Sequence, residues 1–163
     1  MSIRIWRVYN PAFGNDPFDG EGARLVGGRW NSEGVPVVYC SGSLALAVLE
    51  VLVNAQLNLT LSSYQAVPVD VDEKHIEKIN ERRLPPGWRQ SPPSYSVRSI
   101  GDEWAVKCSS LVLEVPSAVI PIEKNFVINP LHVAIPKLVK GKPIPLPIDD
   151  RLRNWKNASG IHE

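Results

Sequence analysis

The sequence has few cysteines and no metal-binding motif. Of its 163 residues only Cys40 and Cys108 are cysteines, and they form no CxxC pair. Two distant cysteines without a nearby histidine do not fit a zinc site or a disulfide-rich secreted scaffold, although a single disulfide remains open. We therefore expect no metal ion.

The sequence also lacks long apolar runs and an excess of either charge. No uninterrupted apolar stretch approaches the roughly 20 residues of a membrane span, and the first residues do not resemble a secretory signal. The expected location is thus a reducing cytoplasm, without membrane attachment. The 18 Lys and Arg residues nearly balance the 17 Asp and Glu residues. This argues against nucleic-acid binding through a broad basic surface but leaves room for a local basic pocket.

The length suits one domain of ordinary size. We expect this domain at residues 1–155, followed by a C-terminal tail at 156–163. The 15 prolines are spread along the chain and gather after residue 85. They favour many short strands and turns over long helices. No internal repeat is present.

Apolar periodicity predicts a series of short elements. Strands are expected at 3–8, 35–41, 64–71 and 110–115, with a further strand beginning at Val119 and an edge strand around 144–148. Helices are expected at 44–52 after Ser43 as N-cap, around 100–104 with Asp102 as cap, and for one turn near 149–155. A polar stretch at 74–80 fits a helical turn. Residues 10–22 are rich in Pro, Gly and Asp, and are expected to form a loop that could cover a site.

Residues 27–31, GGRWN, are the segment best suited to contact a ligand. The glycine pair allows positive φ and lets a ligand approach the backbone closely. Arg29 offers a planar fork of donors suited to phosphate or carboxylate. Trp30 and Asn31 add a stacking surface and an amide. A plain turn with a surface arginine and a core tryptophan explains the same pattern equally well.

Glu50 is a carboxylate on a largely apolar helix face. On a helix it shares that face with Leu46, Ala47 and Val53. A buried unpaired charge would be costly, so a buried Glu50 needs Arg29 or a ligand hydroxyl as its partner. An exposed helix edge is the alternative.

Four further residues are candidates for the same site. Arg7 shares a strand face with apolar residues, and is either an edge-strand arginine or a second cation of the pocket. Tyr39 stacks on a flat ring or fills the core, and Ser41 caps the next helix or touches ligand. Ser117 is expected in a tight turn between two strands. Without a GxSxG elbow or a suitably placed histidine, it is predicted to be a hydrogen-bonding wall residue rather than a nucleophile.

Taken in order, these segments resemble the RES domain family, which is named for an Arg, a Glu and a Ser. Arg29 in GGRWN, Glu50 at the end of the Leu-rich helix and Ser117 in VPSA match the three residues. The strand GVPVVYCS at 34–41 lies between the first two. The resemblance continues through 125–130 and 149–152, so it covers nearly the whole chain.

The resemblance implies an NAD-consuming toxin of a toxin–antitoxin pair, with a fold similar to ADP-ribosyltransferases. It implies a compact single α+β domain with a mixed or split β-sheet and few helices, using NAD as substrate and no metal. Glu50 and Arg29 would be catalytic. The residues expected to bind substrate are Arg7, Asn31, Tyr39, Ser41 and Ser117.

The same resemblance implies a partner. Family antitoxins usually carry a helix-turn-helix domain of the Xre type, and the partner should cover the pocket; a homodimer or a larger toxin–antitoxin complex remains open. Whether water, phosphate or a protein accepts the ADP-ribose is also open. Transfer to a protein target is one alternative. The other is a non-enzymatic binding module in which Arg29 and Glu50 form a structural ion pair, and a Glu50→Gln variant would separate it from an enzyme.

Overall fold

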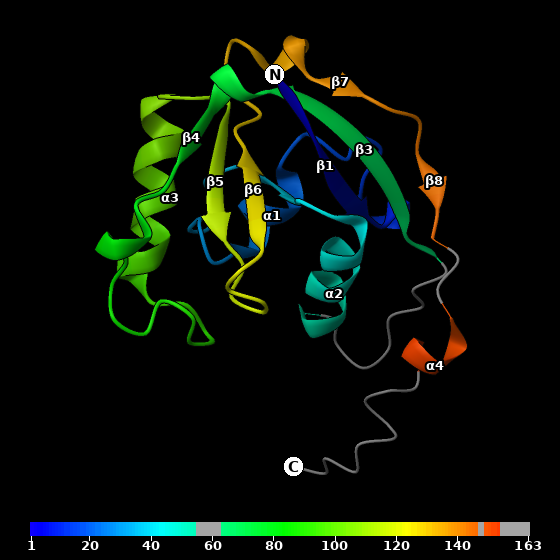
Figure 1. The fold of residues 1–163 in the computed structure, drawn as a ribbon, viewed down its shortest axis with the longest axis horizontal. Coiled ribbons are helices and arrows are strands. Elements are labelled where there is room, and N and C mark those ends of the chain that lie inside the picture. The colour runs from blue at the N-terminus through cyan, green and yellow to red at the C-terminus, as the bar shows by residue number, and fades with distance from the viewer. Residues whose placement is uncertain (55–62, 147–148, 154–163) are drawn as a thin grey trace.

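The computed structural model describes residues 1–54, 63–146 and 149–153, which form one mixed β-sheet with helices packed against it (Figure 1). The strands are β1 (Ser2–Tyr9), β2 (Val38–Ser41), β3 (Gln65–Asp72), β4 (Ile76–Lys78), β5 (Val112–Pro116), β6 (Lys124–Ile128), β7 (Val139–Lys140) and β8 (Ile144–Pro145). The α-helices are α1 (Glu21–Val26), α2 (Leu44–Asn54), α3 (Tyr95–Lys107) and α4 (Asp150–Arg153), and short 3-10 turns lie at Pro11–Phe13, Glu73–His75, Glu81–Arg83 and Ile135–Lys137. The predicted single α+β domain with a mixed sheet and few helices is confirmed.

The pairing between the central strands β1 and β2 is the weakest in the sheet. The strand order is β4-β5-β6-β2-β1-β3-β7, and β8 also pairs with β3. Neighbours are antiparallel except β4 and β5, which run parallel. β1 and β3 pair along eight residues each, whereas within the described chain β1 and β2 meet only where Trp6 lies opposite Ser41. Beyond that pair β1 and β2 are not paired, and of the two expected forms, a mixed or a split sheet, the structure shows the continuous mixed one.

Because side chains alternate along each strand, apolar side chains are buried on both faces of the sheet. On one face Ile5, Val69 and Phe126 are buried together with Phe18 and Leu138, which come from the segments outside the sheet. This cluster anchors the 10–22 loop through Phe18. The loop therefore packs on the face opposite the one that carries α2 and α3.

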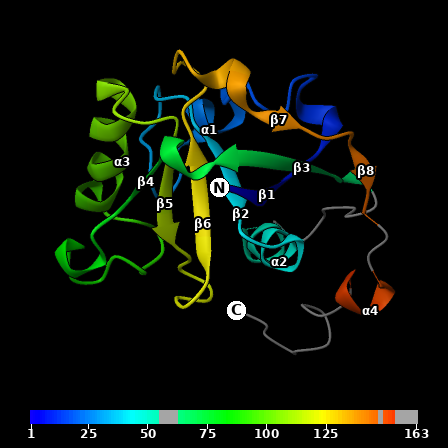
Figure 2. The ribbon, with the colours of Figure 1, turned by 45° about the horizontal axis from the view of Figure 1, so that its top comes forward.

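The helices α2 and α3 cover the other face of the sheet. Val115 and Val127 pack there against Trp104 of α3, while Val8 and Ala66 pack near α2. Figures 1 and 2 show β5 and β6 between the two helices. Strands β5 and β6 therefore lie between α2 and α3 on this face of the sheet.

Helix α2 begins where the sequence predicts. The Ser43 hydroxyl accepts a 3.1 Å hydrogen bond from the Leu46 amide, which satisfies one of the free N–H groups at the helix start. Leu46, Ala47 and Leu52 are buried along the helix. Their burial fixes the rotation of α2 about its axis, and this rotation determines where Glu50 points.

The predicted helix around 100–104 is wrong in its start and in its cap. Helix α3 begins at Tyr95, directly after the extended Ser94, and Asp102 lies in its middle. Pro92 and Pro93 set the start, because proline cannot donate to a preceding turn. Gly101 suggests a break in sequence, but a Cβ there would overlap the Trp30 carbonyl oxygen, so the glycine lets α3 lie directly on the neighbouring loop.

One other expectation fails, and a second is incomplete. The chain from Val119 does not start a strand, because the Ser117 hydroxyl accepts hydrogen bonds from the Val119 and Ile120 amides and closes a turn. The next strand, β6, begins only at Lys124. The polar stretch at 74–80 contains a short 3-10 turn, as expected, but also the three-residue strand β4, which is too short to show periodicity.

The remaining expectations concern the termini and long apolar segments. The predicted tail at 156–163 lies outside the described residues, so the boundary at 155 remains a prediction. In the part of the chain that the structure describes, no helix has the length and apolar character needed to cross a bilayer.

Candidate active site

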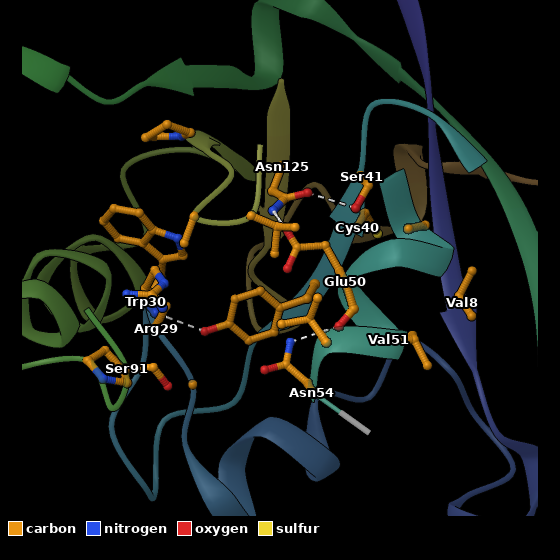
Figure 3. Close-up of a pocket in the computed structure, with 18 of the residues that line it drawn as sticks. Val8, Arg29, Trp30, Cys40, Ser41, Glu50, Val51, Asn54, Ser91 and Asn125 are labelled. Carbon is orange, nitrogen blue, oxygen red and sulfur yellow. Dashed lines mark hydrogen bonds between the residues drawn. The ribbon is translucent and has the colours of Figure 1, made fainter. Parts of the chain in front are cut away.

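A cavity of about 670 Å³ opens on the sheet face between α2 and α3 (Figure 3). Its volume lies within the range usual for small-molecule sites. Its charged lining residues, among those described, are Glu50 and four arginines: Arg7, Arg29, Arg89 and Arg98. The cavity is therefore cationic, with one carboxylate in its wall.

The Glu50 carboxylate is fixed by two hydrogen bonds from distant parts of the chain. Its Oε1 atom accepts a 2.7 Å bond from the Ser117 hydroxyl and a 2.6 Å bond from Asn125 Nδ2. No described residue donates to Oε2. One oxygen thus holds the side chain in place while the other is available to a ligand.

The same polar cluster extends across the sheet to β2. Ser41 and Asn125 face each other in the β2–β6 register, and the Ser41 hydroxyl donates a 2.7 Å bond to Asn125 Oδ1. The Asn125 amide therefore has its oxygen toward Ser41 and its Nδ2 toward Glu50, as Figure 3 shows. Strand register thus determines the orientation of the group that holds Glu50.

Arg29 lies across the cavity from Glu50 (Figure 3). Its Nη1 donates to the carbonyl oxygens of Trp88 and Gln90 at 2.6 and 2.9 Å. Partial burial lowers the pKa of the guanidinium, which nearby Glu50 raises and Arg89 lowers further. The group still stays charged, because arginine does not deprotonate in proteins.

The pairing of Arg29 with Glu50, one of the alternatives left open by the sequence, is not formed. Among the described residues, no ion pair joins these two side chains. The burial argument foresaw a partner for Glu50, but Ser117 and Asn125 take that part. The version of the binding-module alternative that relies on this ion pair is therefore wrong.

Tyr39 and Asn31 hold the segment 27–32, called here the arginine loop. The Tyr39 hydroxyl donates a 2.6 Å bond to Asn31 Oδ1 and accepts a 3.0 Å bond from the Trp30 amide. Burial raises the pKa of the phenol well above its ordinary value. The hydroxyl is thus neutral and both donates and accepts a hydrogen bond, and Tyr39 lines the cavity.

The side chain of Asn31 points away from the cavity, behind the backbone of the arginine loop. It is fully buried, and its Nδ2 donates to the carbonyl oxygens of Ala23 and Val35 at 2.8 and 3.0 Å. Gly28 fits against this arrangement, since a Cβ there would lie 2.5 Å from the Tyr39 hydroxyl. The geometry gives Asn31 a positioning part.

Helix α3 ties down the other end of the arginine loop. The two carboxylate oxygens of Asp102 accept bonds from the Ser32 amide at 2.8 Å and the Ser32 hydroxyl at 2.6 Å. Together with the close approach at Gly101, this joins α3 and the loop into one wall. Asp102, expected as a helix cap, thus serves a tertiary contact.

Arg7 lies on β1 next to the single residue pair that joins β1 to β2. Its Nε donates to the Pro17 carbonyl at 3.1 Å and its Nη1 to the Tyr39 carbonyl at 3.2 Å. Burial is the main cause that lowers the pKa of its guanidinium. Arg7 lines the cavity, so it lies where a second cation of the pocket was expected.

A family comparison identifies the fold that carries this site. The profile of the RES domain matches residues 4–149. The chain belongs to the RES domain family. This confirms the resemblance drawn from the segments around Arg29, Glu50 and Ser117.

Curated relatives of this RES domain protein are toxins by name. Toxin Res of Yersinia enterocolitica is 32% identical over 152 residues, covering 93% of this chain and all of that protein. Toxin Res of Photorhabdus laumondii is 35% identical over 149 residues, covering 91% of this chain and 96% of that protein. The Prs ADP-ribosylating toxin of Sphingobium sp. is 36% identical over 138 residues, covering 81% of this chain and 85% of that protein.

A solved structure shares the fold. The crystal structure of the M. tuberculosis MbcT–MbcA toxin–antitoxin complex contains a chain that superposes with a TM-score of 0.74 at 20% sequence identity. The match covers 97% of this RES domain chain and 90% of that chain.

The structure brings most of the predicted site residues to one cavity. Five of them line it: Arg7, Arg29, Tyr39, Ser41 and Glu50. Ser117 is fully buried beside Glu50, and Asn31 is buried behind the arginine loop. The sequence interpretation missed Arg89 and Arg98. The true start of α3 would have pointed to Arg98, since it puts this residue one helical turn before Asp102.

Proposed function

We propose that this RES domain chain is the toxin of a toxin–antitoxin pair and cleaves NAD at the nicotinamide–ribose bond, which depletes cellular NAD. The observation that carries the proposal is the Glu50 carboxylate, held by Ser117 and Asn125 in the wall of a cavity lined by arginines. One fixed carboxylate among cations suits a substrate that develops positive charge at one carbon and carries phosphates nearby.

The reaction gives Glu50 a definite part. The bond between the nicotinamide nitrogen and ribose C1′ breaks, and its electron pair returns to the nitrogen and neutralises the pyridinium ring. Positive charge then develops on the ribose, as in glycoside hydrolysis. The Oε2 atom of Glu50 is available to stabilise this charge and to accept a ribose hydroxyl. Water or phosphate then bonds to C1′ and releases a proton.

The remaining cavity residues suit the other parts of the dinucleotide. The guanidinium of Arg29 would bind the pyrophosphate, with Arg7 as a second cation, since arginine forks match phosphate oxygens. The ring of Tyr39 would stack on nicotinamide. Ser41 would reach the substrate from β2 or act through Asn125, and Ser117 would act through Glu50.

An antitoxin partner is part of the proposal. The solved neighbour comes from a complex of a toxin with an antitoxin, which supports such a partner here. Val26 and Val53 lie at the cavity and are largely exposed, at 73% and 47%. A partner that covers the cavity would bury both. We expect it to carry a helix-turn-helix domain of the Xre type.

One other activity at the same cavity has specific support. The Sphingobium relative is named an ADP-ribosylating toxin, so a protein side chain could take the place of water or phosphate as acceptor. The cleavage step at C1′ and the part of Glu50 would be unchanged. A hydrolase, a phosphorylase and a transferase differ only in what attacks C1′.

Product analysis tests the proposal. The purified chain, freed of any partner, is incubated with NAD with and without phosphate, and nicotinamide and the ADP-ribose product are quantified. Free ADP-ribose indicates hydrolysis, and ADP-ribose 1″-phosphate indicates phosphorolysis. Nicotinamide release only when a lysate supplies acceptor proteins indicates transfer. No nicotinamide in any arm, with the chain folded, contradicts NAD cleavage.

A further inference from the structure

Arg98 differs from the other arginines of the cavity in its hydrogen bonds. Arg7 and Arg29 each donate to two backbone carbonyls, and Arg89 donates to the Ala118 carbonyl at 3.2 Å. Arg98 Nε, in contrast, is buried and has no partner among the described residues. It is a charged donor at the cavity with its hydrogen bond unmade.

Within the described ranges, no neighbouring side chain supplies the missing acceptor. Asp102, one turn further along α3, uses both carboxylate oxygens for Ser32. The Tyr39 hydroxyl, whose pKa Arg98 influences through its charge, is engaged with Asn31 and Trp30. Leaving a buried charged donor unpaired is unfavourable. The acceptor must therefore come from something that enters the cavity.

The surrounding charges define what that acceptor is. The charge of Arg89 lowers the pKa of Arg29, and in the described chain none of the cavity arginines forms an ion pair with a carboxylate. An anion is the acceptor that suits this group of cations best. A phosphate group fits best, because two of its oxygens can meet the parallel N–H groups of a guanidinium.

We propose that Arg98 is a phosphate-binding residue of the cavity, donating from Nε and an Nη atom to one phosphate group. This inference rests on the proposed function and deepens it. The phosphate is either part of the dinucleotide pyrophosphate or the free phosphate that attacks C1′. Both share the chemistry that Arg98 recognises, and they differ in the step they affect.

The way α3 is held supports a binding part for Arg98. Arg98 and Asp102 are four residues apart, so they project from the same face of the helix. Asp102 and Gly101 fix that face against the arginine loop. The helix face that carries Arg98 is therefore held against the loop that carries Arg29, which suits two residues that bind one ligand.

Direct binding tests the proposal without relying on turnover. ADP-ribose and inorganic phosphate are each titrated calorimetrically into the wild type, Arg98→Gln and Arg98→Lys. Arg83→Gln, which removes an exposed arginine outside the cavity, is the matched control. We expect Arg98→Gln to weaken ADP-ribose, phosphate or both by about ten- to hundredfold. The lysine should recover only part, because it lacks the planar fork.

The pattern of losses identifies the phosphate. Weaker ADP-ribose binding with unchanged phosphate binding assigns Arg98 to the pyrophosphate, and the reverse assigns it to the attacking phosphate. Affinities within twofold of wild type for both ligands, or an equal loss in Arg83→Gln, overturn the proposal. If the wild type binds these ligands yet releases no nicotinamide from NAD, the proposed function fails while the Arg98 inference still stands or falls on binding.

The stability of the variant gives a second readout. Because Arg98 Nε has no partner among the residues that the structure describes, Arg98→Gln should unfold in urea at the wild-type midpoint or above it. A clear fall in the midpoint, with ligand affinity unchanged, would mean that Arg98 is structural and would overturn the proposal.

Discussion

The Glu50 carboxylate on α2 accepts a 2.7 Å hydrogen bond from the hydroxyl of Ser117, which lies 67 residues later in the turn between β5 and β6. Ser117 also accepts hydrogen bonds from the Val119 and Ile120 amides. One hydroxyl therefore shapes the turn and holds the carboxylate. The third residue in the name of the family thus donates a hydrogen bond to the second.

The two donors to Glu50 should matter more for turnover than for substrate binding. Removing one hydrogen bond to a charged group loses about 1.5–3 kcal/mol, or roughly ten- to hundredfold in rate if the bond orients the carboxylate in the transition state. We expect Ser117→Ala and Asn125→Ala each to lower kcat by this factor with little change in KM. Steady-state NAD cleavage per folded molecule measures it.

A surface serine provides the control for that pair. Ser109 donates to Glu77 at 3.0 Å on the exterior, so Ser109→Ala should keep the wild-type kcat. If Ser117→Ala and Asn125→Ala raise KM tenfold and leave kcat unchanged, these residues do not orient the Glu50 carboxylate for catalysis.

Gly28 is predicted to be intolerant of a methyl group. An alanine Cβ would lie 2.5 Å from the Tyr39 hydroxyl and 2.9 Å from Asn31 Oδ1, so Tyr39 would have to release the arginine loop. We expect Gly28→Ala to lower the free energy of unfolding by about 1–3 kcal/mol and to reduce activity. Gly22 in α1 has open space around it, and Gly22→Ala should be neutral or stabilise by up to about 1 kcal/mol. Equal urea midpoints for the two variants would refute this account of the loop.

The tie between α3 and the arginine loop is open to a double-mutant cycle. Ser32→Ala, Asp102→Ala and the double variant should give a coupling free energy of about 1–3 kcal/mol, since Ser32→Ala removes the hydroxyl bond to Asp102 and keeps the amide bond. Urea unfolding measures all four states. Additive effects within about 0.5 kcal/mol would mean that the contact does not join the two segments.

Alkaline pH should destabilise the fold through Cys40. Burial raises the pKa of the Cys40 thiol to about 12, while nearby Arg7 lowers it. The unfolded chain loses this proton near pH 9 and the native state keeps it, so the unfolded state binds fewer protons and stability falls as pH rises. Between pH 9 and 10 the fall should reach up to about 1.4 kcal/mol per pH unit.

Cysteine variants separate this effect from general alkaline denaturation. Cys40→Ala should flatten the slope of unfolding free energy against pH between 9 and 10, whatever its effect on absolute stability. Cys108 is exposed, and Cys108→Ala should keep the wild-type slope. The prediction fails if both variants behave alike.

Local patterns in the sequence predicted the parts of the site that depend on neighbours along the chain. The apolar run after Ser43 was sufficient to predict α2 and to put Glu50 on it. The partners of Glu50 have no such signal, because Ser117 and Asn125 lie 67 and 75 residues away and meet it only through strand register. Ser117 was matched through the family resemblance, and Asn125 appeared in the sequence analysis only as part of the matching segment 125–130.

Tertiary contacts explain the errors around α3. Gly101 and Asp102 look like a helix start in sequence, since glycine weakens a helix and aspartate caps one. Both instead serve the contact with Trp30 and Ser32. Because the predicted helix started too late, Arg98 was not assigned to it and was not recognised as a candidate. Only the packing of the helix on the arginine loop reveals why these residues occur there.

The measurement that tests the central claim most directly is nicotinamide release from NAD by the partner-free wild type and Glu50→Gln. The glutamine keeps an oxygen that can accept from Ser117 and Asn125, so the fold should survive. The account predicts release by the wild type, at least a hundredfold less by the variant, and urea midpoints that agree within about 1 kcal/mol. Release by Glu50→Gln at the wild-type rate, or none by the folded wild type, would contradict it.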